Sequence, residues 1–456
     1  FWLKLCSPEL PRVGGPRVGS PTGRCSCGRV LHLADYPPLL LLTCPPLQSS
    51  RTARASSCKL AIQAMHDDAN VDILLKQLPQ LGTNLSAVER AAVVADECYW
   101  KALCPRLHVG SEDMRRLLAD AIIDPEADLV DELRDRMTQD GYWDVSHDAL
   151  REDGSVHLSW AVNVEAMAEG MTLLTKAGWP PSFLLMYDDP WLLAHQLKHL
   201  IRMTSGNQML YDFAFFNVGS NLTPTGEADE VDGPSSRGWA PHRDRGQDAT
   251  KTAFRSDGTP QYCTTWVALT DATTYSSCLA CVPKRYDPGY SGGDGGHDPM
   301  TAIFKASGSN ALQYIRALPV SAGSIIQFSH RLLHWGTAAA GSTAWRQQAP
   351  RIAMSFASAD ARFEQPFLSE DASRCPLPAV STRAGLVAGL AIFYIGNENP
   401  GQWRTRLYWD CFRASQCQGC FTERFATIVA QNFQASEAVR RSSENRKMNR
   451  ASDYIQ

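Results

Sequence analysis

The sequence contains no long uninterrupted run of apolar residues. A helix needs ~18–20 such residues to cross a membrane, and the patch from Leu39 to Leu42 is short and flanked by prolines. A large excess of one charge is also absent, since 44 basic and 48 acidic residues give a formal net charge of −4. This balance lacks the basic footprint of a nucleic-acid-binding domain. We therefore expect no membrane span and no nucleic-acid partner.

Regular disulfide spacing is missing too, although the chain has 14 cysteines. Scattered cysteines in a chain of this length are typical of reduced thiols inside a cell, which predicts an intracellular protein, cytoplasmic or organellar. Cys278 and Cys281 have the CxxC spacing, as do Cys417 and Cys420, and with Cys411 nearby they can be read as halves of a zinc site. Neither pair has a basic or His-rich context, so structural thiols are the preferred interpretation.

The first 64 residues lack methionine and nearly lack acids. They contain eight basic residues and two acidic ones, and they are rich in proline, glycine, serine and arginine. This composition predicts disorder. It fits an organelle transit peptide, or a segment upstream of a start at Met65, which we favour.

What the chain does have is helical patterning in its first half. Asn84 is a candidate cap for an amphipathic run to Trp100. Further helices are expected over residues 113–120, 125–138, 164–177 and 190–203. The helix over 125–138 should end near Gly141, because glycine readily adopts the left-handed conformation.

After residue 208 the pattern changes to short strands rich in aromatic and β-branched residues. Strands are expected over residues 209–218, 261–270, 279–283, 323–328 and 351–358, with an earlier one starting at Tyr142. Helices placed mainly before strands indicate the α+β class, and short strands separated by polar turns favour a sandwich or barrel. Residues 284–309 contain five glycines between 289 and 296 and are predicted to be a long loop. Residues 404–447 return to a helical pattern.

His242 and Asp244 lie two residues apart in the run Pro241-His-Arg-Asp-Arg. On an extended segment such residues share a face, so both side chains can reach one metal ion. A distal histidine follows in Ser329-His-Arg-Leu-Leu-His-Trp, where His334 is preferred over His330 as the third ligand. Two histidines and one carboxylate are the ligand set of non-haem ferrous iron, which leaves coordination positions open.

An arginine follows this ligand set at the start of the last strand. Arg351 shares a strand face with Ser355, while the opposite face is apolar. A guanidinium offers a planar fork that binds a carboxylate through two hydrogen bonds. The order of residues therefore predicts an iron site with an arginine, and a hydroxyl beside it, for an acidic 2-oxo co-substrate.

Four stretches together resemble the phytanoyl-CoA dioxygenase family. They are Trp239-Ala-Pro-His-Arg-Asp-Arg, Thr265-Trp-Val-Ala-Leu-Thr-Asp-Ala-Thr, Cys278-Leu-Ala-Cys-Val-Pro and Gly323-Ser-Ile-Ile-Gln-Phe-Ser-His-Arg-Leu-Leu-His-Trp-Gly. The resemblance covers about residues 205–360. It implies a double-stranded β-helix, or jelly-roll, core with an N-terminal helical flank and a C-terminal helical extension.

The resemblance also implies an activity and a site. Members are Fe(II)- and 2-oxoglutarate-dependent oxygenases. Iron is expected at His242, Asp244 and His334, with 2-oxoglutarate held by Arg351 and contacted by Trp266. The expected reaction uses dioxygen to hydroxylate a small organic substrate while 2-oxoglutarate is decarboxylated to succinate. Two alternatives are a catalytically silent jelly-roll binding protein and a zinc-stapled interaction module.

These observations predict four regions. They are a disordered leader or non-native upstream segment (1–64), a helical N-terminal region (65–110), a dioxygenase domain with the jelly-roll core (111–370) and a mostly helical C-terminal extension (371–456).

Overall fold

The computed structural model describes residues 93–120, 122–145, 162–218, 239–245, 254–337, 350–395 and 402–453. The predicted leader over 1–64 and the predicted cap at Asn84 lie outside these residues. The four predicted region boundaries stay predictions.

Helices occupy the described N-terminal part of the chain. They are α4 (Glu97–Leu103), α5 (Glu112–Asp120), α6 (Ala127–Asp140), α7 (Val164–Lys176), the 3₁₀ helix η1 (Pro181–Met186) and α8 (Asp189–Ser205). Local chemistry sets their ends: the side chain of Asn163 caps α7 by accepting from the Ala166 amide. Gly141 ends α6 in the left-handed conformation, as predicted, with φ of 80°.

The main sheet has five antiparallel strands in the order β1-β6-β3-β8-β2. They are β1 (Tyr142–Val145), β6 (Ile325–Ser329), β3 (Tyr262–Ala268), β8 (Arg351–Ala359) and β2 (Gln208–Val218). The strands predicted from sequence thus form, with small shifts at their ends. Neighbours in the sheet are distant in the chain, so the sheet unites segments that the sequence separates.

A second antiparallel sheet has three strands in the order β5-β4-β7. They are β5 (Arg316–Leu318), β4 (Leu279–Val282) and β7 (Leu333–Gly336). Residues 284–309, predicted as a loop, instead contain η3 (Lys284–Tyr286), α10 (Gly289–Gly292) and α11 (Pro299–Ser307), and η4 (Gly308–Tyr314) follows. That prediction was wrong because Asp298 caps α11 and Pro299 occupies its first turn, while the glycines upstream serve turns and close packing.

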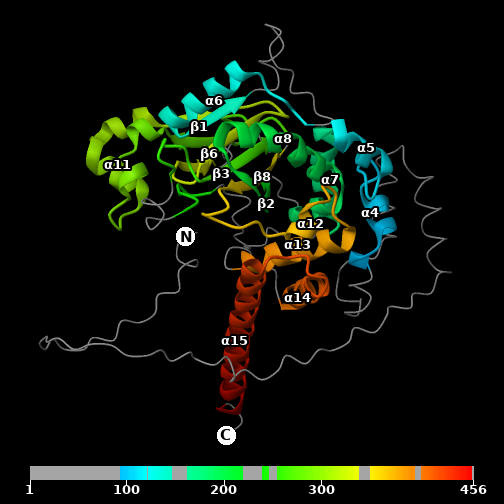
Figure 1. Cartoon of the computed structure of the whole chain (residues 1–456). Coiled ribbons are helices and arrows are strands. Elements are labelled where there is room, and N and C mark those ends of the chain that lie inside the picture. The colour runs from blue at the N-terminus through cyan, green and yellow to red at the C-terminus, as the bar shows by residue number, and fades with distance from the viewer. Residues whose placement is uncertain are drawn as a thin grey trace, which may run out of the picture.

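The C-terminal part is helical, with α12 (Glu370–Ser373), α13 (Val380–Phe393), α14 (Gln402–Gln416) and α15 (Glu423–Asp453). Helix α13 is buried along most of its length, which explains why it lacks an amphipathic pattern. Helix α15 projects away from the rest of the molecule (Figure 1).

The two faces of the main sheet serve different purposes. One face, with Val267, Ile352 and Met354, packs against the helices in the largest apolar cluster. The other face, with Trp266 and Ala353, packs against Leu279 and Cys281 of the second sheet. Burying each large apolar side chain contributes ~1.5–3 kcal/mol, so both faces are strongly specified.

This architecture supports the coarse part of the fold prediction, which is mixed helix and antiparallel sheet consistent with a jelly-roll core. None of the helices in the described part of the chain combines the length and the apolar character that crossing a membrane requires.

Candidate metal centre

Three side chains from two distant segments meet at the edge of the core. The Oδ1 atom of Asp244 lies 3.7 Å from Nε2 of His242 and 3.6 Å from Nε2 of His334. One candidate ligand atom from each residue lies within 4.8 Å of the others, and within the described ranges this is the one such group of three or more His, Cys, Asp or Glu residues. The sequence-predicted triad is therefore brought together in space.

The backbone fixes the two imidazoles relative to each other. His242 and His334 form an isolated antiparallel bridge. The His242 amide donates to the His334 carbonyl at 2.9 Å, and the His334 amide donates back at 3.0 Å. The ring centroids lie 4.4 Å apart.

Each imidazole is also oriented by its second nitrogen. Nδ1 of His242 lies 2.8 Å from the carbonyl oxygen of Ala240, and Nδ1 of His334 lies 3.1 Å from that of Leu332. A carbonyl can only accept, so each Nδ1 carries a proton, and in the neutral ring Nε2 is then the atom that presents a lone pair. Burial, with a smaller electrostatic contribution from the neighbouring His242, lowers the pKa of His334 to about 4, which keeps this ring neutral at physiological pH, as metal binding requires.

Thr264 on β3 orients the carboxylate, a role that the sequence did not reveal. Its hydroxyl donates to Oδ2 of Asp244 at 2.5 Å. This bond engages one carboxylate oxygen and leaves Oδ1 facing the two imidazoles. One feature of the sequence could have indicated this role. Thr264 lies two residues before Trp266 on the same strand, so the two side chains share a face, and Trp266 was already expected to line the cavity.

Arg351 is buried next to Gly336, which lies two residues beyond His334 on β7. It is 1% exposed, and its Nε and Nη2 atoms have no hydrogen-bond partner among the residues that the structure describes. Gly336, two residues after His334, is its neighbour: a Cβ atom there would lie 3.4 Å from Nη2 of Arg351, in ordinary van der Waals contact. Burial lowers the pKa of Arg351 to about 10, so the guanidinium stays charged at neutral pH. Buried guanidinium donors that no described residue engages are costly and fit an anionic ligand.

Trp266 and Ser355 lie where a contact with that ligand is expected. The Trp266 ring lies 5.7 Å from the Arg351 guanidinium carbon. Trp266 and Ser355 are paired in the β3–β8 register, and Ser355 is buried on the same strand face as Arg351.

His330, the alternative distal ligand, points elsewhere. Its Nδ1 lies 2.8 Å from the Tyr262 carbonyl oxygen, and its ring contacts those of Phe254 and Phe363. Burial lowers its pKa to about 4. It is a neutral core histidine outside the triad.

The cysteine pairs give the zinc alternative no support in the described part of the chain. Cys278 and Cys281 are free and buried in the core between the sheets, while Cys417 is exposed and Cys420 is buried. Burial raises the pKa of the Cys278 and Cys281 thiols, which opposes the thiolate form that zinc binds.

Residues 192–347 match the family model described as phytanoyl-CoA dioxygenase (PhyH). None of the curated proteins matches the chain significantly. The matched segment contains the whole triad and ends just before Arg351. With the donor set described above, this match supports a non-haem oxygenase with Fe(II) as the metal and 2-oxoglutarate as co-substrate.

Several solved structures show a weak likeness. The non-haem α-ketoglutarate-dependent epimerase SnoN from nogalamycin biosynthesis is 20% identical, with 52% of this chain and 82% of that chain covered and a TM-score of 0.32. EctD from S. alaskensis, solved with 2-oxoglutarate and 5-hydroxyectoine, is 14% identical, with 54% and 85% covered and a TM-score of 0.33. These scores are too low to support any inference about this chain.

The family match confirms the resemblance drawn from the sequence motifs: residues 192–347 of this chain are similar to the phytanoyl-CoA dioxygenase family.

Proposed function

We propose that this protein is an Fe(II)- and 2-oxoglutarate-dependent hydroxylase of a small organic substrate. The observation that carries the proposal is that a set of metal-ligand atoms and a buried cation suited to a carboxylate lie close to each other. The His242, Asp244 and His334 ligand atoms lie within 4.8 Å of one another, and the buried Arg351 guanidinium beside Gly336 has two donor atoms, Nε and Nη2, that no described residue engages. One set suits a divalent cation and the other suits a carboxylate.

Each residue has a defined task in this proposal. The Nε2 atoms of His242 and His334 and Oδ1 of Asp244 hold Fe(II) on one face, which leaves room for the co-substrate and dioxygen. Arg351 binds the distal carboxylate of 2-oxoglutarate, with Ser355 as a second contact. When bound, the iron supplies oxygen activation coupled to decarboxylation of 2-oxoglutarate, for oxidation of a substrate C–H bond.

Aromatic rings and a hydroxyl pack around the ligands. The Phe328 ring lies 4.3 Å from that of His334, centroid to centroid, and Trp239 lies 6.4 Å from His242. Thr264 keeps the carboxylate of Asp244 in one orientation. Such groups lower the cost of assembling the site at the moment of reaction.

The direct test uses protein reconstituted with Fe(II) in the absence of oxygen. Addition of 2-oxoglutarate should give a weak visible charge-transfer band, and admission of oxygen with a panel of small organic acids, thioesters and amines should give succinate above the uncoupled background. His242→Ala and Asp244→Ala should lose both signals. His199→Ala, on the half-exposed face of α8, is the matched control and should keep both.

Unchanged succinate release in both ligand variants would refute the assignment. A wild-type protein that binds iron yet forms no succinate with any substrate would favour the catalytically silent binding protein instead.

A further inference from the structure

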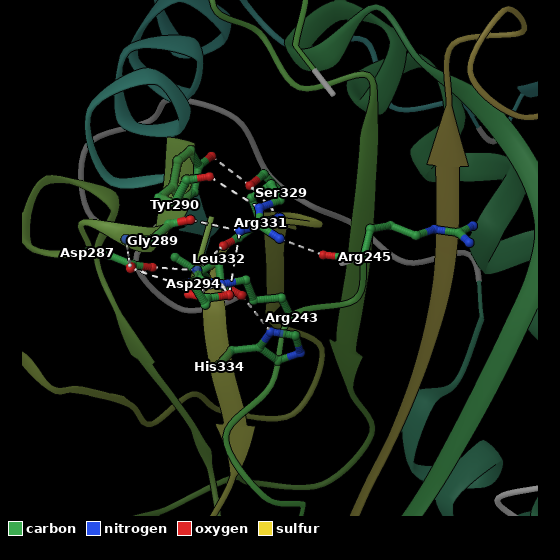
Figure 2. Close-up of polar contacts among 10 residues, drawn as sticks. All are labelled: Arg243, Arg245, Asp287, Gly289, Tyr290, Asp294, Ser329, Arg331, Leu332 and His334. Carbon is green, nitrogen blue, oxygen red and sulfur yellow. Dashed lines mark hydrogen bonds and ion pairs between the residues drawn. The ribbon is translucent and has the colours of Figure 1, made fainter. Parts of the chain in front are cut away.

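Arg243, the residue between the two predicted ligands His242 and Asp244, is the centre of a buried ionic cluster. Neighbouring residues of an extended segment point to opposite sides, so Arg243 points away from the side that its neighbours share. It is 0% exposed. Figure 2 shows its side chain directed at Asp287 and Asp294, which follow β4.

The donors of Arg243 are engaged from several directions. Nη1 and Nη2 bind the two carboxylate oxygens of Asp287 at 2.5 and 2.9 Å. Nη2 and Nε bind those of Asp294 at 2.6 and 3.0 Å. Nη1 also donates to the Arg331 carbonyl at 2.5 Å. A buried arginine shared by two carboxylates has one preferred position, because any shift leaves charges unpaired.

A second buried arginine joins the cluster from the other ligand segment. Arg331, three residues before His334, donates through Nη2 to the Gly289 carbonyl at 2.7 Å and through Nε to the Tyr290 carbonyl at 3.2 Å. Its Nη1 donates to the Arg245 carbonyl at 2.8 Å, and its Nη2 lies 3.8 Å from Asp294. We call these four residues, Arg243, Arg331, Asp287 and Asp294, the Arg243 cluster. Its two guanidiniums and two carboxylates balance in charge.

The segment that supplies the acceptors is shaped for this contact. A Cβ atom at Gly289 would lie 2.1 Å from Oδ1 of Asp294 and 2.5 Å from Nη2 of Arg243, so only glycine fits there. The Tyr290 hydroxyl also lies 2.6 Å from that of Ser329, at the end of β6. Residues 287–294, the brace segment, therefore contact both chain segments that carry predicted ligands.

We propose that the brace segment, through the Arg243 cluster, sets the separation of the 242–244 and 330–334 segments and so preorganises the metal site. In this proposal Arg243 and Arg331 are positioning residues. Asp287 and Asp294 bind the Arg243 guanidinium, and Gly289 allows their close approach. The proposal rests on the proposed function, because it names what holds the iron ligands in place. The glycine-rich stretch between residues 289 and 296 would therefore hold the ligand segments in place, and would not act as a mobile loop.

The test compares Asp294→Asn with Asp188→Asn. Asp188 also pairs with a buried arginine, Arg383, at 2.7 Å, but at the start of α8. Gly289→Ala is the second test variant, and Gly385→Ala in α13, where a Cβ would lie 2.3 Å from the Ser415 hydroxyl, is its control. The readouts are amide hydrogen exchange of the metal-free protein and the Fe(II) dissociation constant, measured by chelator competition.

Both test variants should exchange faster than wild type over residues 239–245 and 330–336, and should bind Fe(II) about 10–100-fold more weakly. Both controls should keep wild-type exchange there and wild-type affinity, even if they unfold at lower temperature. Wild-type exchange in the test variants, or equal loosening in the controls, would overturn the proposal. If one test variant does not fold, the other decides. If wild-type protein binds no iron, the proposed function fails, and the exchange data on metal-free protein still decide whether the brace exists.

Discussion

His242 and His334 exchange backbone hydrogen bonds of 2.9 and 3.0 Å although 92 positions separate them in the chain. This bridge joins a segment between β2 and β3 to β7. It holds the backbones of the two histidines side by side, whereas the Asp244 carboxylate depends on a side-chain contact with Thr264 for its orientation.

Replacing Thr264 with valine should weaken iron binding. The substitution removes the hydroxyl that donates to Asp244 and keeps the side-chain shape, so the carboxylate loses its fixed orientation. We expect the Fe(II) dissociation constant to rise about 10-fold, measured by chelator competition. Thr264→Ser restores the hydroxyl and should restore the affinity. A valine variant with wild-type affinity would show that Thr264 has no positioning role.

Replacing Arg351 with methionine should weaken 2-oxoglutarate binding without lowering the stability of the fold. We expect the 2-oxoglutarate dissociation constant to rise on the order of 100-fold, since charged hydrogen bonds are worth ~1.5–3 kcal/mol each. Iron affinity should not change. The free energy of unfolding should stay the same or rise, because the variant no longer buries the charge and the two donor atoms that no described residue engages.

Arg351→Lys is the control for charge, and should bind 2-oxoglutarate with intermediate affinity because lysine lacks the planar fork. Titration followed by the charge-transfer band measures the affinity, and denaturant unfolding measures stability. Unchanged 2-oxoglutarate affinity in the methionine variant would remove Arg351 from the site.

Paired substitutions of the two distal histidines should have different outcomes. His334→Asn should abolish stoichiometric iron binding. His330→Asn should retain it, because an asparagine amide can still donate to the Tyr262 carbonyl that now pairs with His330. Metal analysis after desalting gives the answer, with circular dichroism as the check on folding. Iron loss in the His330 variant alone would reverse the assignment of the third ligand.

Stability should depend on pH through Asp212 in β2. Burial is the main cause that raises the pKa of this carboxyl to about 7, and Tyr394 donates to it at 2.6 Å. Because the folded pKa lies above the unfolded one, its contribution to stability is full below about pH 4 and is lost as pH rises towards 7. Asp212→Asn should therefore match wild type at pH 4.

At pH 8 the same variant should be more stable than wild type by roughly 1–3 kcal/mol. Denaturant unfolding of the metal-free protein at both pH values measures the difference. The control is Asp135→Asn, which changes an exposed carboxylate on α6 and should leave the pH dependence as in wild type. Equal stability of wild type and Asp212→Asn at pH 8 would contradict the raised pKa.

The elements could be predicted from sequence wherever local chemistry decides them. Alternating side chains set β8, and Gly141 ended α6 as expected. The segment after β4 was mispredicted because glycine occurs both in flexible loops and where two groups approach each other closely. At Gly289 it allows close approach of Asp294 and Arg243, and sequence alone does not distinguish this use from a flexible loop.

The sequence by itself determined the chemical types at the candidate site. The i, i+2 spacing of His242 and Asp244 and the later His334 and Arg351 are local facts about an ordered set of residues. Only the tertiary structure decided which groups surround them: His334 and not His330 joins the triad, Thr264 orients Asp244, and two buried arginines connect the ligand segments to residues 287–294. These relationships depend on contacts between segments dozens of residues apart, formed when the two sheets pack, and no local pattern in the chain specifies them.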